Sequence, residues 1–271
     1  MIYQKIYLKD ITNLDVGNES FMTLYIPDEE KEVVIDPRPV MVVCPGGGYN
    51  MISSREDWSI AFRYVSEGFS CISLHYSIKT AYPVPQLELA VVINYINQHA
   101  KEYRMDAKCI NLVGFSAGGH LAASYSLYYK DLAKKLDVSS ESLKPFSIVL
   151  GYPVIRKDLD TLSITIKTIS GSNEEVAKKM DIVDNMTSDF PPTFVWTTKE
   201  DDFITPKNSI MLVDKLKSLH IPHQFVLFDH GVHGGSLCNH AVYDEKYDFN
   251  HIRENRTWVD QSVDFIFSLR K

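Results

Sequence analysis

The segment Gly114-Phe115-Ser116-Ala117-Gly118 contains the residue types that point most directly to chemistry. It matches the pattern G-x-S-x-G, in which a serine stands on a sharp turn between a strand and a helix. The flanking glycines leave the room that such a turn needs where the strand and the helix nearly touch. An apolar run precedes Gly114 and a helical stretch follows Ser116. We therefore predict that Ser116 is a catalytic nucleophile.

A serine hydroxyl is a weak nucleophile at neutral pH, so it needs an imidazole to take its proton and a carboxylate to orient that imidazole. For a serine on a strand-to-helix turn, the acid and then the base follow along the chain. Glu200-Asp201-Asp202 lies between an apolar strand and Pro206, where a helix can begin. We favour Asp202 as the acid because a short turn separates it from Pro206, and Asp201 is the alternative.

The base must come from the nine histidines of the chain. Those before Ser116 violate the chain order, and His120 lies on the helix just after the nucleophile, too near along the chain to reach its hydroxyl. The glycine-rich stretch Asp229-His230-Gly231-Val232-His233-Gly234-Gly235 follows the last apolar run. We predict His233 as the general base, with His230 as the alternative.

Attack on a carbonyl group creates an oxyanion, which needs preorganised hydrogen-bond donors. The backbone N–H of Ala117, directly after the nucleophile, is one candidate donor. Others lie in the loop Gly46-Gly47-Gly48, which leaves the apolar run at residues 39–44. Neither G-x-x-x-x-G-K-[ST] nor G-x-G-x-x-G is present there, which disfavours a phosphate-binding loop.

Strands and helices alternate along most of the chain, and this alternation must position the site. Predicted strands cover residues 4–11, 21–26, 39–44, 70–76, 109–114, 146–151, 192–197 and 223–228. Predicted helices cover residues 57–67, 85–103, 117–129, 206–219 and 255–269. Several of the strand runs are apolar throughout, as expected for strands covered by helices on both faces. The pattern predicts a mostly parallel, doubly wound sheet in a single catalytic domain, residues 1–271.

Residues 154–190 interrupt this alternation. They contain Gly171-Ser172-Asn173 and then a predicted short helix at 174–180. Long connections are often functional, so we predict that this segment is a cap or roof over the pocket. The alternative is a surface crossover without substrate contact.

Composition excludes several classes of protein. The 271 residues carry a formal charge of −7 and no clustered Lys and Arg, which argues against nucleic-acid binding. No apolar run approaches the roughly 20 residues needed to cross a bilayer. The first ten residues alternate in polarity and lack the features of a secretory signal, so we expect a cytoplasmic protein. The four cysteines lack C-x-x-C spacing, which favours reduced thiols over metal ligation or disulfides.

Together, these segments resemble the esterase/lipase branch of the α/β-hydrolase superfamily, especially bacterial acetyl-xylan-esterase-like and sugar-ester hydrolases. The resemblance rests on Pro45-Gly46-Gly47-Gly48-Tyr49, Gly114-Phe115-Ser116-Ala117-Gly118-Gly119-His120-Leu121-Ala122, Tyr152-Pro153-Val154, Asp201-Asp202 before Pro206, and His233-Gly234. It spans nearly the whole chain. Relatives of the hormone-sensitive-lipase type carry His where this chain has Pro45, which separates it from that group.

The resemblance implies an α/β-hydrolase fold with a mostly parallel sheet of about eight strands and helices on both faces. It implies that Ser116, Asp202 and His233 form the catalytic triad. It also implies that the oxyanion donors are the amides of Gly47, Gly48 and Ala117.

The leading functional hypothesis is hydrolysis of short acyl esters, with acetyl groups on a sugar or oligosaccharide as the favoured substrate. This chemistry needs side chains, backbone donors and water, so no metal or organic cofactor is expected. Tyr49, Trp58 and Tyr152 are candidates for aromatic contact with a sugar ring, and simple packing is the equally favoured alternative. The alternatives are a peptidase, which shares the catalytic parts but here lacks a gating domain, and a non-catalytic small-molecule binding protein on the same fold.

Overall fold

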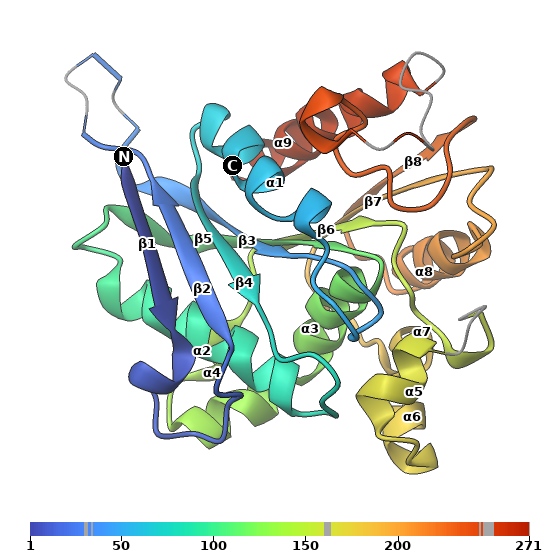
Figure 1. Ribbon diagram of the computed structural model, residues 1–271, viewed down its shortest axis with the longest axis horizontal. Helices are drawn as coiled ribbons and strands as arrows, with labels where there is room; N and C mark the ends of the chain where they lie inside the picture. Colours follow the sequence, from blue (N-terminus) through green and yellow to red (C-terminus); the bar gives the residue numbers. More distant parts are fainter. Residues whose placement is uncertain (30–31, 34, 160–163, 244, 246–251, 271) are drawn as a thin grey trace.

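Among the described residues, eight strands form one sheet in the order β1-β2-β4-β3-β5-β6-β7-β8. This is seen in a computed structural model of the protein (Figure 1). The structure describes residues 1–29, 32–33, 35–159, 164–243, 245 and 252–270. The strands are β1 (Ile2–Tyr7), β2 (Phe21–Ile26), β3 (Arg38–Cys44), β4 (Ser70–His75), β5 (Met105–Phe115), β6 (Ser147–Gly151), β7 (Thr193–Thr198) and β8 (His223–Phe228).

Strands β3 to β8 run parallel, and β2 is antiparallel to its neighbours β1 and β4. The prediction of a mostly parallel sheet is therefore confirmed. The antiparallel pair lies at one edge, where β1 exposes most of its side chains, whereas β3, β6 and β7 are buried along their whole length. Burial on both faces explains why the central strands are continuous apolar runs.

Alternate residues of the central strands enter two different hydrophobic clusters. Val40 and Val42 lie in one cluster, and Met41 and Val43 lie in the other. This is the period of two that a pleated strand imposes on its side chains. The sheet thus separates two apolar layers, and each must be covered by helices.

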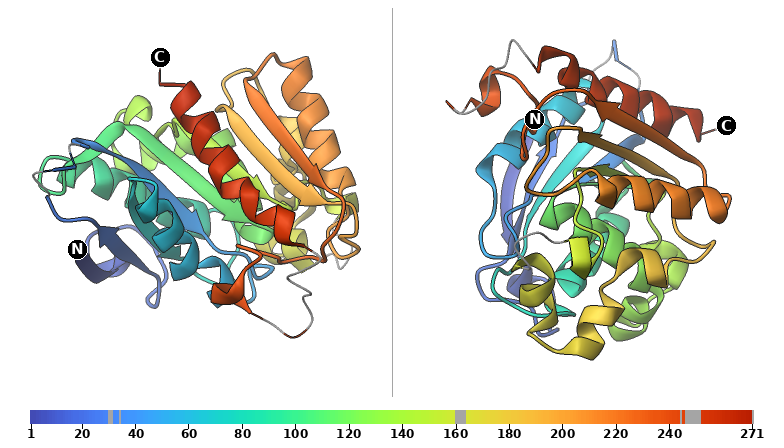
Figure 2. Two further views of the ribbon diagram at one scale, coloured as in Figure 1. Left: turned by 90° about the horizontal axis from the view of Figure 1, so that it is seen from above. Right: turned by 90° about the vertical axis from the view of Figure 1, so that its right-hand side faces the viewer.

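Helices cover both faces of the sheet. Figure 2 shows α1 and α9 on one face, and α2, α3 and α8 on the other. The α-helices are α1 (Trp58–Ser66), α2 (Val84–His99), α3 (Ala117–Leu136), α4 (Ser140–Leu143), α5 (Ile164–Ser170), α6 (Glu174–Lys179), α7 (Ile182–Asn185), α8 (Lys207–Ser218) and α9 (Trp258–Ser268). Short 3-10 helices are η1 (Leu8–Asp10), η2 (Ser54–Glu56), η3 (Lys157–Leu159), η4 (His240–Val242) and η5 (Arg253–Thr257).

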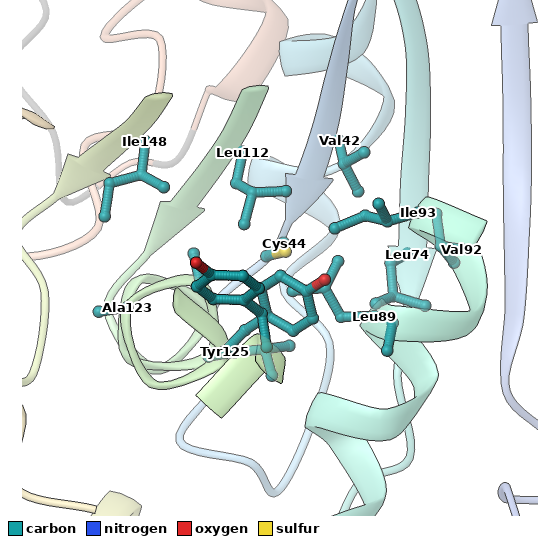
Figure 3. Packing of buried hydrophobic residues seen from close by; sticks show 14 of the residues in the cluster. Val42, Cys44, Leu74, Leu89, Val92, Ile93, Leu112, Ala123, Tyr125 and Ile148 are labelled. Carbon is teal, nitrogen blue, oxygen red and sulfur yellow. The ribbon is translucent and has the colours of Figure 1, made fainter. Parts of the chain in front are cut away.

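The larger cluster lies between the sheet and helices α2 and α3. Figure 3 shows Val42, Leu112 and Ile148 of the sheet facing Leu89 of α2 and Tyr125 of α3. All five side chains are fully buried. The Tyr125 hydroxyl donates to the carbonyl oxygen of Leu143 at 2.6 Å, so burying this phenol leaves no unpaired polar group. The core therefore fixes α3, whose first turn follows the proposed nucleophile.

The carboxyl ends of the parallel strands meet at one edge of the sheet, where an open α/β sheet usually binds its ligands. Ser116 follows β5, Asp201 follows β7, and His233 follows β8. Because β5, β6, β7 and β8 are neighbours in this order, residues far apart in the chain come together there.

The structure differs from the predicted elements mainly at the ends and in residues 154–190. Strand β1 begins at Ile2 and ends at Tyr7, and the chain then turns into η1. The segment 154–190 contains α5 and α7 besides the predicted helix, which is α6. Residues 160–163 of this predicted cap lie outside the described residues.

Candidate active site

Ser116 occupies the turn between β5 and α3 with strained backbone angles, φ 51° and ψ −118°. A non-glycine residue with positive φ is uncommon and marks a constrained position. A Cβ on Gly114 would lie 2.3 Å from the carbonyl oxygen of Gly118, and a Cβ on Gly118 would lie 2.0 Å from that of Cys44. Only glycine fits at both positions, so these residues make the turn possible.

The side chains of Ser116, His233 and Asp201 form one chain of hydrogen bonds. The distance from Ser116 Oγ to His233 Nε2 is 3.0 Å, and that from His233 Nδ1 to Asp201 Oδ2 is 2.8 Å. An ionised carboxylate can only accept, so Nδ1 donates to Asp201 and Nε2 faces Ser116 Oγ as an acceptor. The Asp201 side chain is 1% exposed and that of His233 is 18% exposed. The geometry is that of an activated serine.

The acid in contact with His233 is Asp201, and the preference for Asp202 was wrong. Asp201 Oδ1 accepts from the backbone N–H groups of Phe203 at 3.1 Å and Ile204 at 2.8 Å, which turns its other oxygen toward His233. Asp202 is exposed. The distance in sequence to Pro206 could not reveal which of two adjacent carboxylates points inward, because the direction depends on this backbone turn.

His230, the alternative base, pairs with Glu200, whereas the histidine bonded to Ser116 Oγ is His233. Its Nδ1 lies 3.0 Å from Glu200 Oε1, and this carboxylate raises the pKa of His230 above its ordinary value. Glu200 Oε2 also accepts from the backbone N–H of Gly231 at 2.9 Å. This pair therefore anchors the start of the loop that holds His233.

Two aromatic rings fix the imidazole of His233. The ring centroids of Tyr152 and His233 are 4.9 Å apart in a T-shaped pair at 69°, and those of Phe203 and His233 are 5.0 Å apart in a tilted pair at 30°. Tyr152 follows β6 and Phe203 follows Asp201, so both rings come from the same edge of the sheet. The imidazole can rotate little without losing these contacts.

The glycine loop lies beside the nucleophile, since a Cβ on Gly46 would lie 3.1 Å from Ser116 Cβ. Within the described part of the chain, no hydrogen bond uses the N–H groups of Gly47 and Gly48. The N–H of Ala117 begins α3 and has no acceptor inside the helix. These three amides are the predicted oxyanion donors, and their hydrogen-bonding capacity is available to a ligand.

Most other polar backbone groups of this loop are engaged. Tyr76 Oη donates to the carbonyl oxygen of Pro45 at 2.7 Å, and the Gly46 N–H donates to Glu56 Oε2 at 2.8 Å. The Gly47 carbonyl oxygen accepts from the N–H groups of Asn50 and Met51. The loop is thus fixed from several sides, as preorganised donors require.

Of the aromatic residues considered for sugar contact, Tyr49 and Tyr152 are buried, which favours the alternative of simple packing for both. Tyr49 Oη lies 2.9 Å from His120 Nδ1, and burial lowers the pKa of His120 to about 4. Trp58 is 46% exposed at the start of α1, where it lines a groove with Tyr3 and Phe62. Tyr49 and Tyr152 serve internal packing instead.

Residues 154–190 approach the glycine loop through α5. Ile164 Cγ2 would lie 3.1 Å from a Cβ on Gly48, and Asn50 Nδ2 donates to Thr168 Oγ1 at 3.2 Å and to the Gly48 carbonyl oxygen at 2.8 Å. The described part of this segment therefore borders the candidate oxyanion site.

In the described ranges, no group of three or more His, Cys, Asp or Glu side chains is arranged to hold a metal ion. No helix within them is both long and apolar enough to span a bilayer. All four cysteines are free and buried, and burial raises the pKa of the Cys238 thiol to about 12. Such a thiol is a poor nucleophile.

The BD-FAE family model matches residues 22–216, which is more than half of the chain and includes the glycine loop, Ser116 and Asp201. The chain belongs to the BD-FAE family. Endo-1,4-beta-xylanase B of Butyrivibrio fibrisolvens is 29% identical over 214 residues, which cover 76% of this chain and 34% of that protein. The BD-FAE chain spans between 34% and 51% of the length of the first curated relatives that it matches.

Solved structures similar to this BD-FAE chain include two hydrolases. The carboxylesterase Cest-2923 from Lactobacillus plantarum has a TM-score of 0.86 and 27% identity over 99% of this chain and 98% of that one. The acetyl ester-xyloside bifunctional hydrolase from Caldicellulosiruptor lactoaceticus has a TM-score of 0.79 and 28% identity over 97% of each chain. The predicted α/β-hydrolase fold and the resemblance to esterases are thus confirmed.

Sequence reasoning missed Glu56. This glutamate is 3% exposed and lies in η2, where it contacts Gly46 and, through Oε1 at 2.6 Å, the hydroxyl of Tyr152. Burial and the nearby Glu56 raise the pKa of Tyr152 well above its ordinary value, so this hydroxyl stays protonated and donates. No motif marks Glu56, because its partner Tyr152 lies 96 positions away in the chain.

Proposed function

We propose that the protein is a carboxylic ester hydrolase that forms an acyl-enzyme on Ser116. The observation that carries this proposal is the chain of hydrogen bonds from Ser116 Oγ through His233 to Asp201. The available amides of Gly47, Gly48 and Ala117 beside the nucleophile support it, as does the similarity to a carboxylesterase over nearly the whole chain.

In the acylation step, Ser116 Oγ bonds to the ester carbonyl carbon while its proton passes to His233 Nε2. The carbonyl oxygen becomes an oxyanion and accepts hydrogen bonds from the Gly47, Gly48 and Ala117 amides. Asp201 stabilises the resulting imidazolium. The bond to the alcohol oxygen then breaks, and His233 returns the proton to the leaving alcohol.

In the deacylation step, water takes the place of the alcohol. His233 Nε2 removes a proton from this water as its oxygen bonds to the acyl carbon, and a second oxyanion forms at the same amides. The bond to Ser116 Oγ breaks, Ser116 regains a proton from His233, and the free acid leaves. Both steps use the same side chains and amides together with water, so the proposed reaction needs no cofactor.

We infer that the substrates are short acyl esters, acetyl esters above all, of a sugar or oligosaccharide. One structural neighbour is named as an acetyl ester-xyloside bifunctional hydrolase, and one sequence relative is named as a xylanase. The described part of residues 154–190 would roof the acyl site, because Ile164 of α5 approaches Gly48. A side chain at this place limits the room beside the oxyanion donors.

The direct test uses purified protein, p-nitrophenyl esters from acetate to palmitate, and acetylated xylo-oligosaccharides, with Ser116→Ala as the control. We expect turnover confined to the short esters, acetate release from the oligosaccharides, and loss of both in Ser116→Ala. Preference for long acyl chains would contradict the substrate assignment. No turnover of any ester above the control would reject ester hydrolysis and favour a peptidase or a binding protein.

A further inference from the structure

Glu56 occupies a buried position between the glycine loop and the loop of the general base. Both of its carboxylate oxygens accept hydrogen bonds, one from the Gly46 N–H at 2.8 Å and one from Tyr152 Oη at 2.6 Å. The side chain is 3% exposed, so water does not substitute readily for either donor. Neither of these hydrogen bonds joins Glu56 to Ser116, His233 or Asp201, so any effect that they have on the reaction passes through Gly46 and Tyr152.

The contact with Gly46 bears on the oxyanion donors. Gly46 lies directly before Gly47, whose φ of 125° is a conformation that glycine adopts readily and other residues rarely do. The hydrogen bond to Glu56 fixes the peptide between Pro45 and Gly46, which is the peptide next to the one that carries the Gly47 N–H. The carbonyl of Gly46 is held by the N–H of Ser53 at 3.0 Å.

The contact with Tyr152 bears on the base. Tyr152 Oη donates to Glu56 and accepts from the Ser236 N–H at 3.1 Å, while its ring forms a T-shaped pair with the imidazole of His233. Ser236 Oγ also donates to the carbonyl oxygen of Arg55, the residue before Glu56. The 3-10 helix η2 is thus tied directly and through Tyr152 to the end of the loop that holds His233.

We propose that Glu56 is a positioning residue that holds the oxyanion donors and the general base in one fixed relation. This inference rests on the proposed function, since it concerns the geometry of the same reaction. A carboxylate is suited to the task because it offers two acceptors to two donors. Glutamine offers one acceptor and one NH₂ group, so Glu56→Gln must leave either the Gly46 N–H or the Tyr152 hydroxyl without its acceptor.

The test compares the wild-type protein with Glu56→Gln and with Glu88→Gln as the matched control. Glu88 is a fully buried glutamate that likewise accepts from backbone N–H groups, those of Gly17 and Ser77. Steady-state kinetics with p-nitrophenyl acetate are measured below the melting temperature of each variant. We expect kcat of Glu56→Gln to fall roughly 10- to 100-fold with KM within about twofold, because small displacements of donors act mainly on the transition state.

The affinity for phenylboronic acid is a second measurement, and it should stay unchanged if Glu56 has a purely structural role. It adds to Ser116 Oγ as a tetrahedral anion, so its affinity reports the oxyanion site. We expect Glu56→Gln to lose affinity for the boronic acid roughly in proportion to its loss in kcat/KM. Glu88→Gln should lower the melting temperature while leaving kcat and boronic acid affinity within about twofold of the wild-type values.

A double-mutant cycle with Tyr152→Phe tests the connection itself. This change keeps the ring against His233 and removes only the hydroxyl. If Glu56 acts partly through Tyr152, the fold-loss in kcat of the double variant should be much smaller than the product of the fold-losses of the two single variants.

Wild-type kcat in Glu56→Gln would overturn the inference, as would equal losses in Glu56→Gln and Glu88→Gln or independent effects in the cycle. Each of these outcomes leaves ester hydrolysis by the wild-type protein intact. Absence of wild-type turnover would instead overturn both the proposed function and this inference.

Discussion

The Asp201 carboxylate is held by three hydrogen bonds that depend on how the chain turns after β7. Oδ1 accepts from the N–H groups of Phe203 and Ile204, and Oδ2 faces His233. This turn buries Asp201 and leaves Asp202 exposed. Two chemically identical neighbours therefore have different roles because of backbone direction alone.

Substitution of the two aspartates separates these roles. Asp201→Asn keeps the size of the side chain but places an amide against His233 Nδ1, which favours the wrong imidazole tautomer. We expect kcat for p-nitrophenyl acetate to fall by about 10⁴-fold, as for other serine hydrolases that lose this carboxylate. Asp202→Asn should stay within about twofold of the wild-type rate. Equal losses in both variants, or a larger loss in Asp202→Asn, would contradict the assignment of Asp201.

Other residues of the candidate site differ in how well the sequence predicts them. The turn at Ser116 can be predicted from the sequence because its glycines cannot be replaced. A Cβ on Gly114 or Gly118 would lie less than 3 Å from backbone atoms. His233 can be predicted from its position after the last strand. The sequence does not predict which aspartate contacts His233, because this depends on the hydrogen bonds of one backbone turn. It does not predict Glu56 either, because the partner Tyr152 is distant in the chain.

At the scale of elements, His120 connects α3 to the segment that follows α6. Its Nδ1 lies 2.9 Å from Tyr49 Oη, and its Nε2 lies 2.8 Å from the carbonyl oxygen of Met180. A carbonyl only accepts, so Nε2 carries the proton and Nδ1 accepts from the tyrosine. His120 is fully buried in this neutral form, and burial lowers its pKa from 6.5 to about 4. The helix behind the nucleophile is thus joined to residues 154–190.

This contact makes stability depend on pH. Between pH 6.5 and about 4, the unfolded chain binds a proton on His120 that the folded protein does not. The contribution of neutral His120 is therefore fully present above pH 6.5 and is lost as the pH falls toward 4. His120→Gln retains a donor and an acceptor but cannot titrate. The free energy of unfolding should fall in both proteins when the pH is lowered from 7 to 4.5. We expect this fall to be about 2 kcal/mol smaller in His120→Gln than in the wild-type protein.

Urea unfolding at both pH values provides the measurement. The two proteins share all other titratable groups, so the difference between their pH slopes isolates His120. Parallel slopes would mean that His120 is charged or exposed in the folded protein, contrary to its position in the structure.

The elements themselves follow largely from the sequence. Continuous apolar runs predicted the buried strands, and β2 and β8 have the predicted bounds. Residues 154–190 were less predictable, since α5 and α7 are short and depend on packing against neighbours such as Ile155, whose carbonyl oxygen accepts from the Ile182 N–H. Short helices have little stability of their own, so local pattern identifies them poorly.

At the scale of the molecule, the strand order brings the site together. Ser116 and His233 are 117 positions apart, yet the order β5-β6-β7-β8 places the residues after these strands along one edge. Parallel strands connected by helices necessarily have their carboxyl ends at the same side. The location of the site could therefore be predicted from the sequence, whereas the exact hydrogen-bond partners could not.

The central claim is that Ser116 is the nucleophile of an ester hydrolase, and covalent labelling tests it most directly. A fluorophosphonate probe, which phosphonylates activated serines, is incubated with wild-type protein, and the modified peptide is located by mass spectrometry. We predict one label, on Ser116, with acetyl esterase activity lost in proportion to the labelled fraction and no labelling of Ser116→Ala. Turnover that survives complete labelling of Ser116, or a label on another residue that abolishes it, would contradict the account.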